Sequence, residues 1–213
     1  MEAKDRIKSI LIGISGYLIL LLQRLPGIWV WVPLMAAPVF LLLGVLFVNI
    51  PARITDIFQA LFSINEVVLG KFVIILGLTL TIYSIIFLGI KKRQGLVRSG
   101  PYRFIRHPQY TGFILLTIGF TRWSYYYIKY TFSISWISAE QSIGLWYIEM
   151  MLYFILAFVE EKHLTSFFGS DYTNYKRETP SFLPFFKIDL INHVVSVIGF
   201  SLLFFLVIQF PLT

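Results

Sequence analysis

The chain contains no cysteine and few charged residues, and each shortage excludes a class of protein. Asp, Glu, Lys and Arg make up 14% of the 213 residues, against about 25% in a typical soluble domain. Without cysteine there are no disulfides, thiolate metal sites, iron–sulfur clusters or cysteine nucleophiles. Hydrophobic residues instead make up 57% of the chain. This composition predicts an all-α integral membrane protein of several passes.

Histidine is also scarce, which limits metal chemistry. The chain has 3 histidines, and Glu160-x-x-His163 has the spacing of a carboxylate–histidine metal motif. A di-iron helical bundle needs two such motifs and two further carboxylates, so we predict no metal site. A haem held by a histidine pair is a weaker alternative. Phosphate-binding and serine-hydrolase motifs are absent from the sequence as well.

Six apolar segments approach or exceed the roughly 20 residues that span the hydrocarbon core of a bilayer. They are residues 7–23, 28–49, 67–90, 109–124, 141–159 and 190–211. No small-x-small cleavage site follows the first segment, so we expect it to remain as an uncleaved helix. We predict one membrane domain over 1–213, with three helices in 1–90, a core in 91–189 and a last helix in 190–213.

Two polar segments, 91–108 and 160–189, adjoin the helices predicted over 109–124 and 141–159. These two helices form a hairpin, so both polar segments should lie on one membrane face. That face carries more Lys and Arg than the other, and the positive-inside rule therefore places it in the cytoplasm and both termini outside. The net charge of +7 suits loops that face anionic membrane lipid. We predict no nucleic-acid partner, and nothing indicates an oligomeric state.

The first polar segment places cations directly before a helix. Arg103, Arg106 and His107 precede Pro108, and proline suits the first turn of a helix, where its missing N–H is not needed. The free N–H groups and positive partial charge of a helix N-terminus favour an anion such as a carboxylate or phosphate. Alternatively, the two arginines extend to lipid phosphates. The spacing alone does not decide between these readings.

The second polar segment begins with two carboxylates. Glu160 and Glu161 directly follow an apolar run, and carboxylates at a membrane boundary need solvent or a cationic partner. Gly169 is expected to end this helix. A short amphipathic helix should follow it, with Lys176 on the exposed side, and stop before Pro180.

The pair of segments "LVRSGPYRFIRHPQYTG" and "EEKHLTSFFGSDYTNYKRETPSFLPF" resembles the isoprenylcysteine carboxyl methyltransferase family. Its broader relatives include membrane phospholipid N-methyltransferases. The resemblance covers roughly 94–186 and is more specific for the superfamily than for the substrate. It implies methyl transfer from S-adenosylmethionine to a lipophilic acceptor at the cytoplasmic face, without the soluble Rossmann-type fold. The acceptor would be a lipid amine, a thiol or a prenylcysteine carboxylate.

The resemblance also implies the site residues. The family's cofactor-contacting positions fall on Gln94, Gly95, Leu96, Val97, Tyr102, His107, Pro108, Gln109, Tyr110 and Glu160. Arg106 and Glu161 are predicted as catalytic residues. Arg106 would face an anionic group, and Glu161 or His163 would be the base that an amine acceptor requires.

The cofactor's chemistry suits these residue types. Its carboxylate needs cations or N–H groups, which the 103–110 region offers. Its ammonium needs an acceptor such as Glu160. Its sulfonium favours aromatic faces such as those of Tyr102 and Tyr110. Leu96 and Val97 suit the adenine.

Two positions depart from the family pattern. Leu156 stands where the carboxyl methyltransferases have an arginine that faces the acceptor, and Gln94 stands where histidine is frequent. The first departure makes an amine or thiol acceptor relatively more favourable. A sterol-reductase-like enzyme that uses NADPH is the main alternative, because it shares an RH-x-x-Y loop, but Gln109 differs from its usual asparagine. A non-catalytic membrane scaffold is a third class.

Overall fold

The computed structural model describes residues 68–126, 128–129 and 138–209. Within these residues it contains five α-helices, two short 3-10 turns and no strand, and all of them lie in one compact unit. The all-α class is therefore confirmed for this part of the chain. The spans predicted over 7–23 and 28–49 lie outside the described residues, so the count of six helices and the single domain stay predictions.

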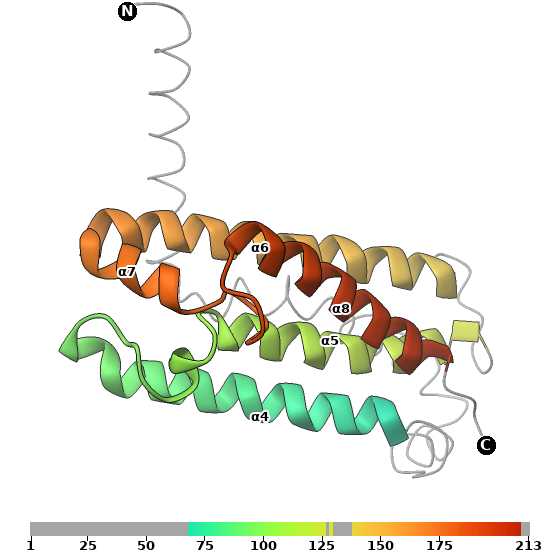
Figure 1. The fold of residues 1–213 in the computed structure, drawn as a ribbon. Helices are drawn as coiled ribbons and strands as arrows, with labels where there is room; N and C mark the ends of the chain where they lie inside the picture. Colours follow the sequence, from blue (N-terminus) through green and yellow to red (C-terminus); the bar gives the residue numbers. More distant parts are fainter. Residues whose placement is uncertain (1–67, 127, 130–137, 210–213) are drawn as a thin grey trace, which may run out of the picture. The chain divides into compact units, whose positions relative to one another are not determined.

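Four long helices account for the four predicted apolar segments in the described part. The helices are α4 (Val68–Lys91), α5 (Pro108–Tyr126), α6 (Ala139–Phe168) and α8 (Asp189–Gln209), with the short α7 (Ser170–Glu178) between the last two. The turns η1 (Lys92–Gln94) and η2 (Gly100–Arg103) connect α4 to α5. In Figure 1, α5 runs alongside α4, and α8 crosses in front. Three of the helices, α4, α6 and α8, are long and apolar enough to cross a membrane.

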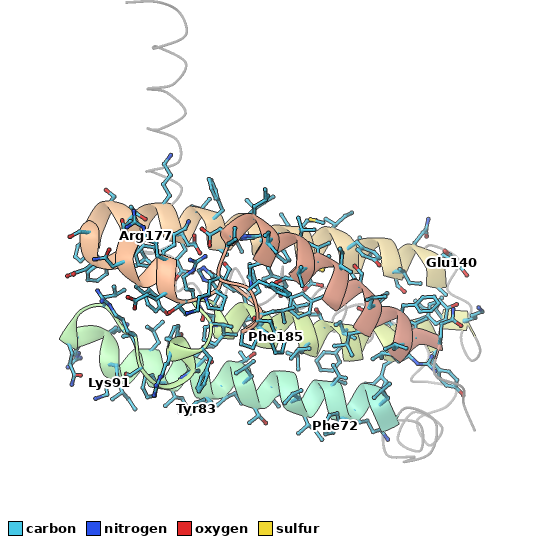
Figure 2. The ribbon with its side chains drawn as sticks, in the orientation of Figure 1. Phe72, Tyr83, Lys91, Glu140, Arg177 and Phe185 are labelled. Atoms are coloured by element: carbon cyan, nitrogen blue, oxygen red, sulfur yellow. The ribbon has the colours of Figure 1, made fainter. Side chains whose placement is uncertain are left out.

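Helix α5 is the central helix of the described bundle, because it packs against α4, α6 and α8. It buries several polar side chains, namely Thr111, Thr117, Thr121, Arg122 and Ser124. Polar groups in a membrane helix are tolerated where they face protein rather than lipid. By contrast, α4 exposes large apolar side chains, including Phe72 and Tyr83, which project outward in Figure 2. Helix α5 is less apolar than its neighbours because its central place turns its polar side chains toward protein.

Helices α4 and α5 approach each other through glycines. A Cβ added at Gly77 of α4 would lie 2.5 Å from the backbone N of Leu116 and 2.6 Å from the carbonyl oxygen of Gly112. Likewise, a Cβ added at Gly119 of α5 would lie 2.6 Å from the carbonyl oxygen of Gly70 in α4. Small residues of this kind allow membrane helices to pack backbone against backbone. This contact fixes the two helices whose connection carries the first polar segment.

Helix α6 has defined ends and runs farther than its apolar segment. Ser138 and Gln141 form a reciprocal capping box at its start, which satisfies two otherwise unpaired backbone N–H groups. Gly169 ends it with a φ of 57°, a conformation that glycine adopts without strain. The end at Gly169 confirms the prediction, but the helix continues from 159 through both glutamates to Phe168. Residues 160–168 of the second polar segment are therefore part of the helix, as the predicted end at Gly169 requires.

We expect Gly77→Ala to destabilise the protein by about 1–3 kcal/mol, because the new methyl group overlaps the backbone of α5. Thermal unfolding in detergent measures this effect. Gly89→Ala is the matched control on the same helix, since its Cβ would meet nothing within 4 Å. Equal melting temperatures for the two variants would contradict the close packing of α4 and α5.

Candidate functional site

The two polar segments are joined by backbone hydrogen bonds. The N–H groups of Arg106 and His107 donate to the carbonyl oxygens of Pro180 and Ser181, at 2.9 and 3.1 Å. The hydroxyl of Thr111 donates to the carbonyl oxygen of Phe182 at 3.0 Å. The structure thus brings together two stretches more than 70 residues apart, as the hairpin model predicts. The segment that precedes α5 is held by the segment that precedes α8.

A buried ion pair reinforces this junction. Arg106 Nη2 lies 2.9 Å from Glu161 Oε1, and the two side chains are 0% and 5% exposed. The same Nη2 lies 2.6 Å from Oδ1 of Asp189, at the start of α8. Nη1 donates to the carbonyl oxygen of Lys176 in α7 at 2.7 Å. One guanidinium therefore ties the loop before α5 to α6, α7 and α8.

Glu161 accepts from three further groups. They are His107 Nε2 at 3.0 Å, Lys176 Nζ at 2.7 Å and the hydroxyl of Ser181 at 3.3 Å. Lys176 Nζ also lies 3.0 Å from Asp189 Oδ2. Burial lowers the pKa of Lys176, but Glu161 and Asp189 outweigh this effect and raise it. The expectation that Lys176 lies on the exposed side is wrong, because its side chain turns inward to these two carboxylates and is 34% exposed.

His107 is buried between the two glutamates. Its Nε2 contacts Glu161, and its Nδ1 lies 3.6 Å from Glu160 Oε2, which is an ion-pair distance rather than a hydrogen bond. Burial lowers the pKa of the imidazole, but the two carboxylates outweigh this effect and raise it. The ring also stacks on that of Tyr110, with centroids 5.5 Å apart. His107 therefore links both glutamates to the start of α5.

A cavity of about 190 Å³ adjoins this network. It is lined by Leu88, Lys92, Gly95, Leu96, Val97, Tyr102, Arg106, Glu160, Leu164, Phe168, Tyr172 and Tyr175. These residues come from the end of α4, the connection to α5, the outer part of α6 and α7. The cavity thus has apolar and aromatic walls with one carboxylate and two cations.

Of the predicted cofactor residues, Gly95, Leu96, Val97, Tyr102 and Glu160 line this cavity. Gln94, His107, Pro108, Gln109 and Tyr110 are not among its lining residues in the described part of the chain. Gln109 supports the lining through its side chain, which accepts from the hydroxyl of Tyr102 at 3.1 Å. Pro108 instead lines a separate apolar hollow of about 370 Å³. Of the two predicted catalytic residues, Arg106 lines the cavity and Glu161 lies behind it.

Sequence reasoning missed half of the lining. Leu164 and Phe168 lie four and eight residues after Glu160 in α6, so the three share one helical face. The helix predicted up to Gly169 already contained this signal, which the prediction of site residues did not use. Tyr172 and Tyr175 belong to the second family segment, but their place in the cavity, like that of Lys92, depends on how α7 and η1 pack.

Three polar atoms of the lining residues are buried without a hydrogen-bond partner among the described residues. They are Glu160 Oε2, Arg106 Nε and the hydroxyl of Tyr172. Buried polar groups in native proteins are normally paired with protein or water. The cavity therefore offers one hydrogen-bond acceptor and two donors that a polar ligand could satisfy.

The fold and the site define a helical membrane protein with a cavity between two polar segments at the helix ends. The isoprenylcysteine carboxyl methyltransferase family model matches residues 60–137, which include the first of these segments. The chain is also 30% identical over 95 residues to protein-S-isoprenylcysteine O-methyltransferase B of Arabidopsis thaliana. This match covers 45% of the chain and 42% of the relative. The two matches confirm the resemblance to this superfamily over the residues they cover.

The chain thus spans less than half the length of the curated relative that it matches. No solved structure matches it significantly.

We expect Arg106→Ala to destabilise the protein by about 3–5 kcal/mol, because it leaves Glu161 buried without its guanidinium partner. Thermal unfolding in detergent measures the loss. Arg98→Ala is the matched control: this arginine also pairs with an aspartate, Asp171 at 3.6 Å, but the two side chains are 42% and 75% exposed. This control substitution should lower the free energy of unfolding by at most about 1 kcal/mol, because the pair is exposed. Similar losses in both variants would contradict the anchoring role of Arg106.

Proposed function

We propose that this protein is an S-adenosylmethionine-dependent membrane methyltransferase that acts on a lipophilic acceptor at the cytoplasmic face. The observation that carries the proposal is the cavity, which lies where the two family segments meet and is lined by Glu160 and by Gly95–Val97. The family match supports a methyltransferase, and no feature of the matches favours an NADPH-dependent reductase.

The cavity residues fit the chemistry of this cofactor. Oε2 of Glu160, which accepts no hydrogen bond from the described residues, would hold the ammonium, since a hydrogen bond to a charged group is stronger than one between neutral groups. The adenine would lie against the apolar side chains of Leu96, Val97 and Leu164. Tyr102 offers an aromatic face to the sulfonium. When bound, S-adenosylmethionine supplies an activated methyl group, and the protein orients the reactants and excludes water.

The lining favours an acceptor that needs no deprotonation. Tyrosine hydroxyls are protonated at neutral pH, and burial raises the pKa of Tyr102, Tyr172 and Tyr175 further, so none of them is a base. Glu161, proposed as a base for an amine acceptor, is already ion-paired with Arg106 and Lys176. An acceptor carboxylate is a nucleophile without losing a proton. A prenylcysteine carboxylate, the acceptor in the relative's name, is therefore the acceptor we favour, even though Leu156 replaces the family arginine.

In this proposal Glu161 acts by holding the site, and Arg106 does so through the part of its guanidinium that pairs with Glu161. Their ion pair fixes the loop that carries Tyr102 and the turn of α6 that carries Glu160. A group that acts through others in this way is a positioning group rather than a participant in the transfer. The membrane lipid around α4 and α8 would deliver the acceptor, since both helices expose large apolar side chains.

We expect S-adenosylhomocysteine to raise the melting temperature of the detergent-solubilised protein, because a ligand that prefers the native state stabilises it. NADPH should have no effect. Glu160→Gln should weaken binding of S-adenosylhomocysteine roughly ten- to a hundred-fold, through loss of a charged hydrogen bond. Glu140→Gln, at the opposite end of α6, is the matched control. A shift with NADPH and none with S-adenosylhomocysteine would overturn the proposal.

We also expect the cavity to open on the cytoplasmic side. Ser99 and Ser170 are exposed near the cavity end, whereas Glu140 lies at the other end of the bundle (Figure 2). Single cysteines can be introduced at these positions because the chain has none. In intact cells an impermeant maleimide should label Glu140→Cys only, and opened cells should also show labelling of Ser99→Cys and Ser170→Cys. The reverse pattern would invert the orientation.

A further inference from the structure

We propose that Tyr172 binds the ligand, and that its hydroxyl and Arg106 Nε together donate to the carboxylate of the cofactor's amino-acid end. The inference rests on the proposed function and assigns Tyr172 a role that the family motifs do not give it.

The three tyrosines that line the cavity differ in how their hydroxyls are used. The hydroxyl of Tyr175 donates to the carbonyl oxygen of Tyr102 at 2.6 Å. That of Tyr102 donates to the Gln109 side chain at 3.1 Å. The Tyr172 side chain is only 1% exposed, yet its hydroxyl has no partner among the described residues. Two of these tyrosines therefore serve the fold, and the third keeps an unused donor.

Arg106 leaves one donor of the same kind. Its Nη1 and Nη2 are taken by Lys176, Glu161 and Asp189, which leaves Nε unpartnered. Arg106, Glu160 and Tyr172 all line the same cavity, so the three unpartnered atoms border one space. The guanidinium therefore offers the ligand a single N–H, whereas an arginine without protein partners offers two parallel N–H groups.

The three unpartnered groups match an α-amino acid. Two donors beside a positive charge suit a carboxylate, and Glu160 Oε2, which accepts no hydrogen bond from the described residues, suits an ammonium. In S-adenosylmethionine these two groups are attached to one carbon atom, so their protein partners must lie close together. Lys92 also lines the cavity, but it is exposed, and an exposed ion pair contributes little.

Calorimetry of Tyr172→Phe with two ligands tests the assignment. S-adenosylhomocysteine carries the carboxylate, and its decarboxylated analogue, S-adenosyl-3-thiopropylamine, keeps the ammonium but lacks the carboxylate. We expect the variant to bind S-adenosylhomocysteine roughly ten-fold more weakly and the analogue with unchanged affinity. Its ligand-free melting temperature should not fall, because the lost hydroxyl had no partner in the protein.

Tyr175→Phe is the matched control. It should lower the melting temperature, because Tyr102 loses a hydrogen bond, and it should leave the ratio of the two ligand affinities as in the wild type. The wild type itself provides a second measurement, since it should prefer S-adenosylhomocysteine to the decarboxylated analogue.

The remaining outcomes would overturn the inference. Unchanged affinity of Tyr172→Phe for S-adenosylhomocysteine would mean that the hydroxyl does not contact the ligand. An equal loss for both ligands would place the hydroxyl on the nucleoside half instead of the carboxylate. If the wild type bound neither ligand, the proposed function itself would fail, and the wild-type titration separates this result from the other two.

Discussion

The described structure depends on the buried ion pair between Arg106 and Glu161. Removing two charges from water is costly, and their attraction compensates only when the remaining donors and acceptors are also paired. Here Asp189, Lys176 and His107 complete that pairing. Because the ion pair and these three partners come from four separate segments, the complete network forms only when α6, α7, α8 and the loop before α5 are all in place. The shape of the cavity is therefore coupled to the native packing.

Adjacent glutamates have different surroundings for a geometric reason. Successive residues of an α-helix are rotated by about 100°, so Glu160 and Glu161 cannot face the same way. Glu161 is turned to the loop and to α7, where it is paired. Glu160 is turned to the cavity, and its Oε2 accepts no hydrogen bond from the described residues, with His107 Nδ1 3.6 Å away. In this pair of consecutive glutamates, Glu161 thus holds the fold together and Glu160 is available to a ligand.

Much of the helical framework was predictable from the sequence, because apolar length, Pro108 and Gly169 mark the helix positions by local rules. The pairing of the two polar segments was predictable from the hairpin and from the family motifs. The side-chain partners were not. Lys176 has the sequence context of an exposed residue, and only the fold of α7 shows that it turns to Glu161. The end of α6 at Gly169 was predicted from the glycine, whereas hydropathy alone reports only where the helix is apolar.

The length of α6 has a consequence for how two very different molecules meet. Its 30 residues extend about 45 Å at 1.5 Å per residue, whereas the hydrocarbon core of a bilayer is about 30 Å thick. If α6 crosses the bilayer, roughly a third of this continuous helix would stand outside the hydrocarbon core, and the polar stretch from Glu160 to Phe168 suits that part. A water-soluble molecule and a lipid tail would then reach the same helix from opposite phases. Neither needs to leave the solvent that suits it.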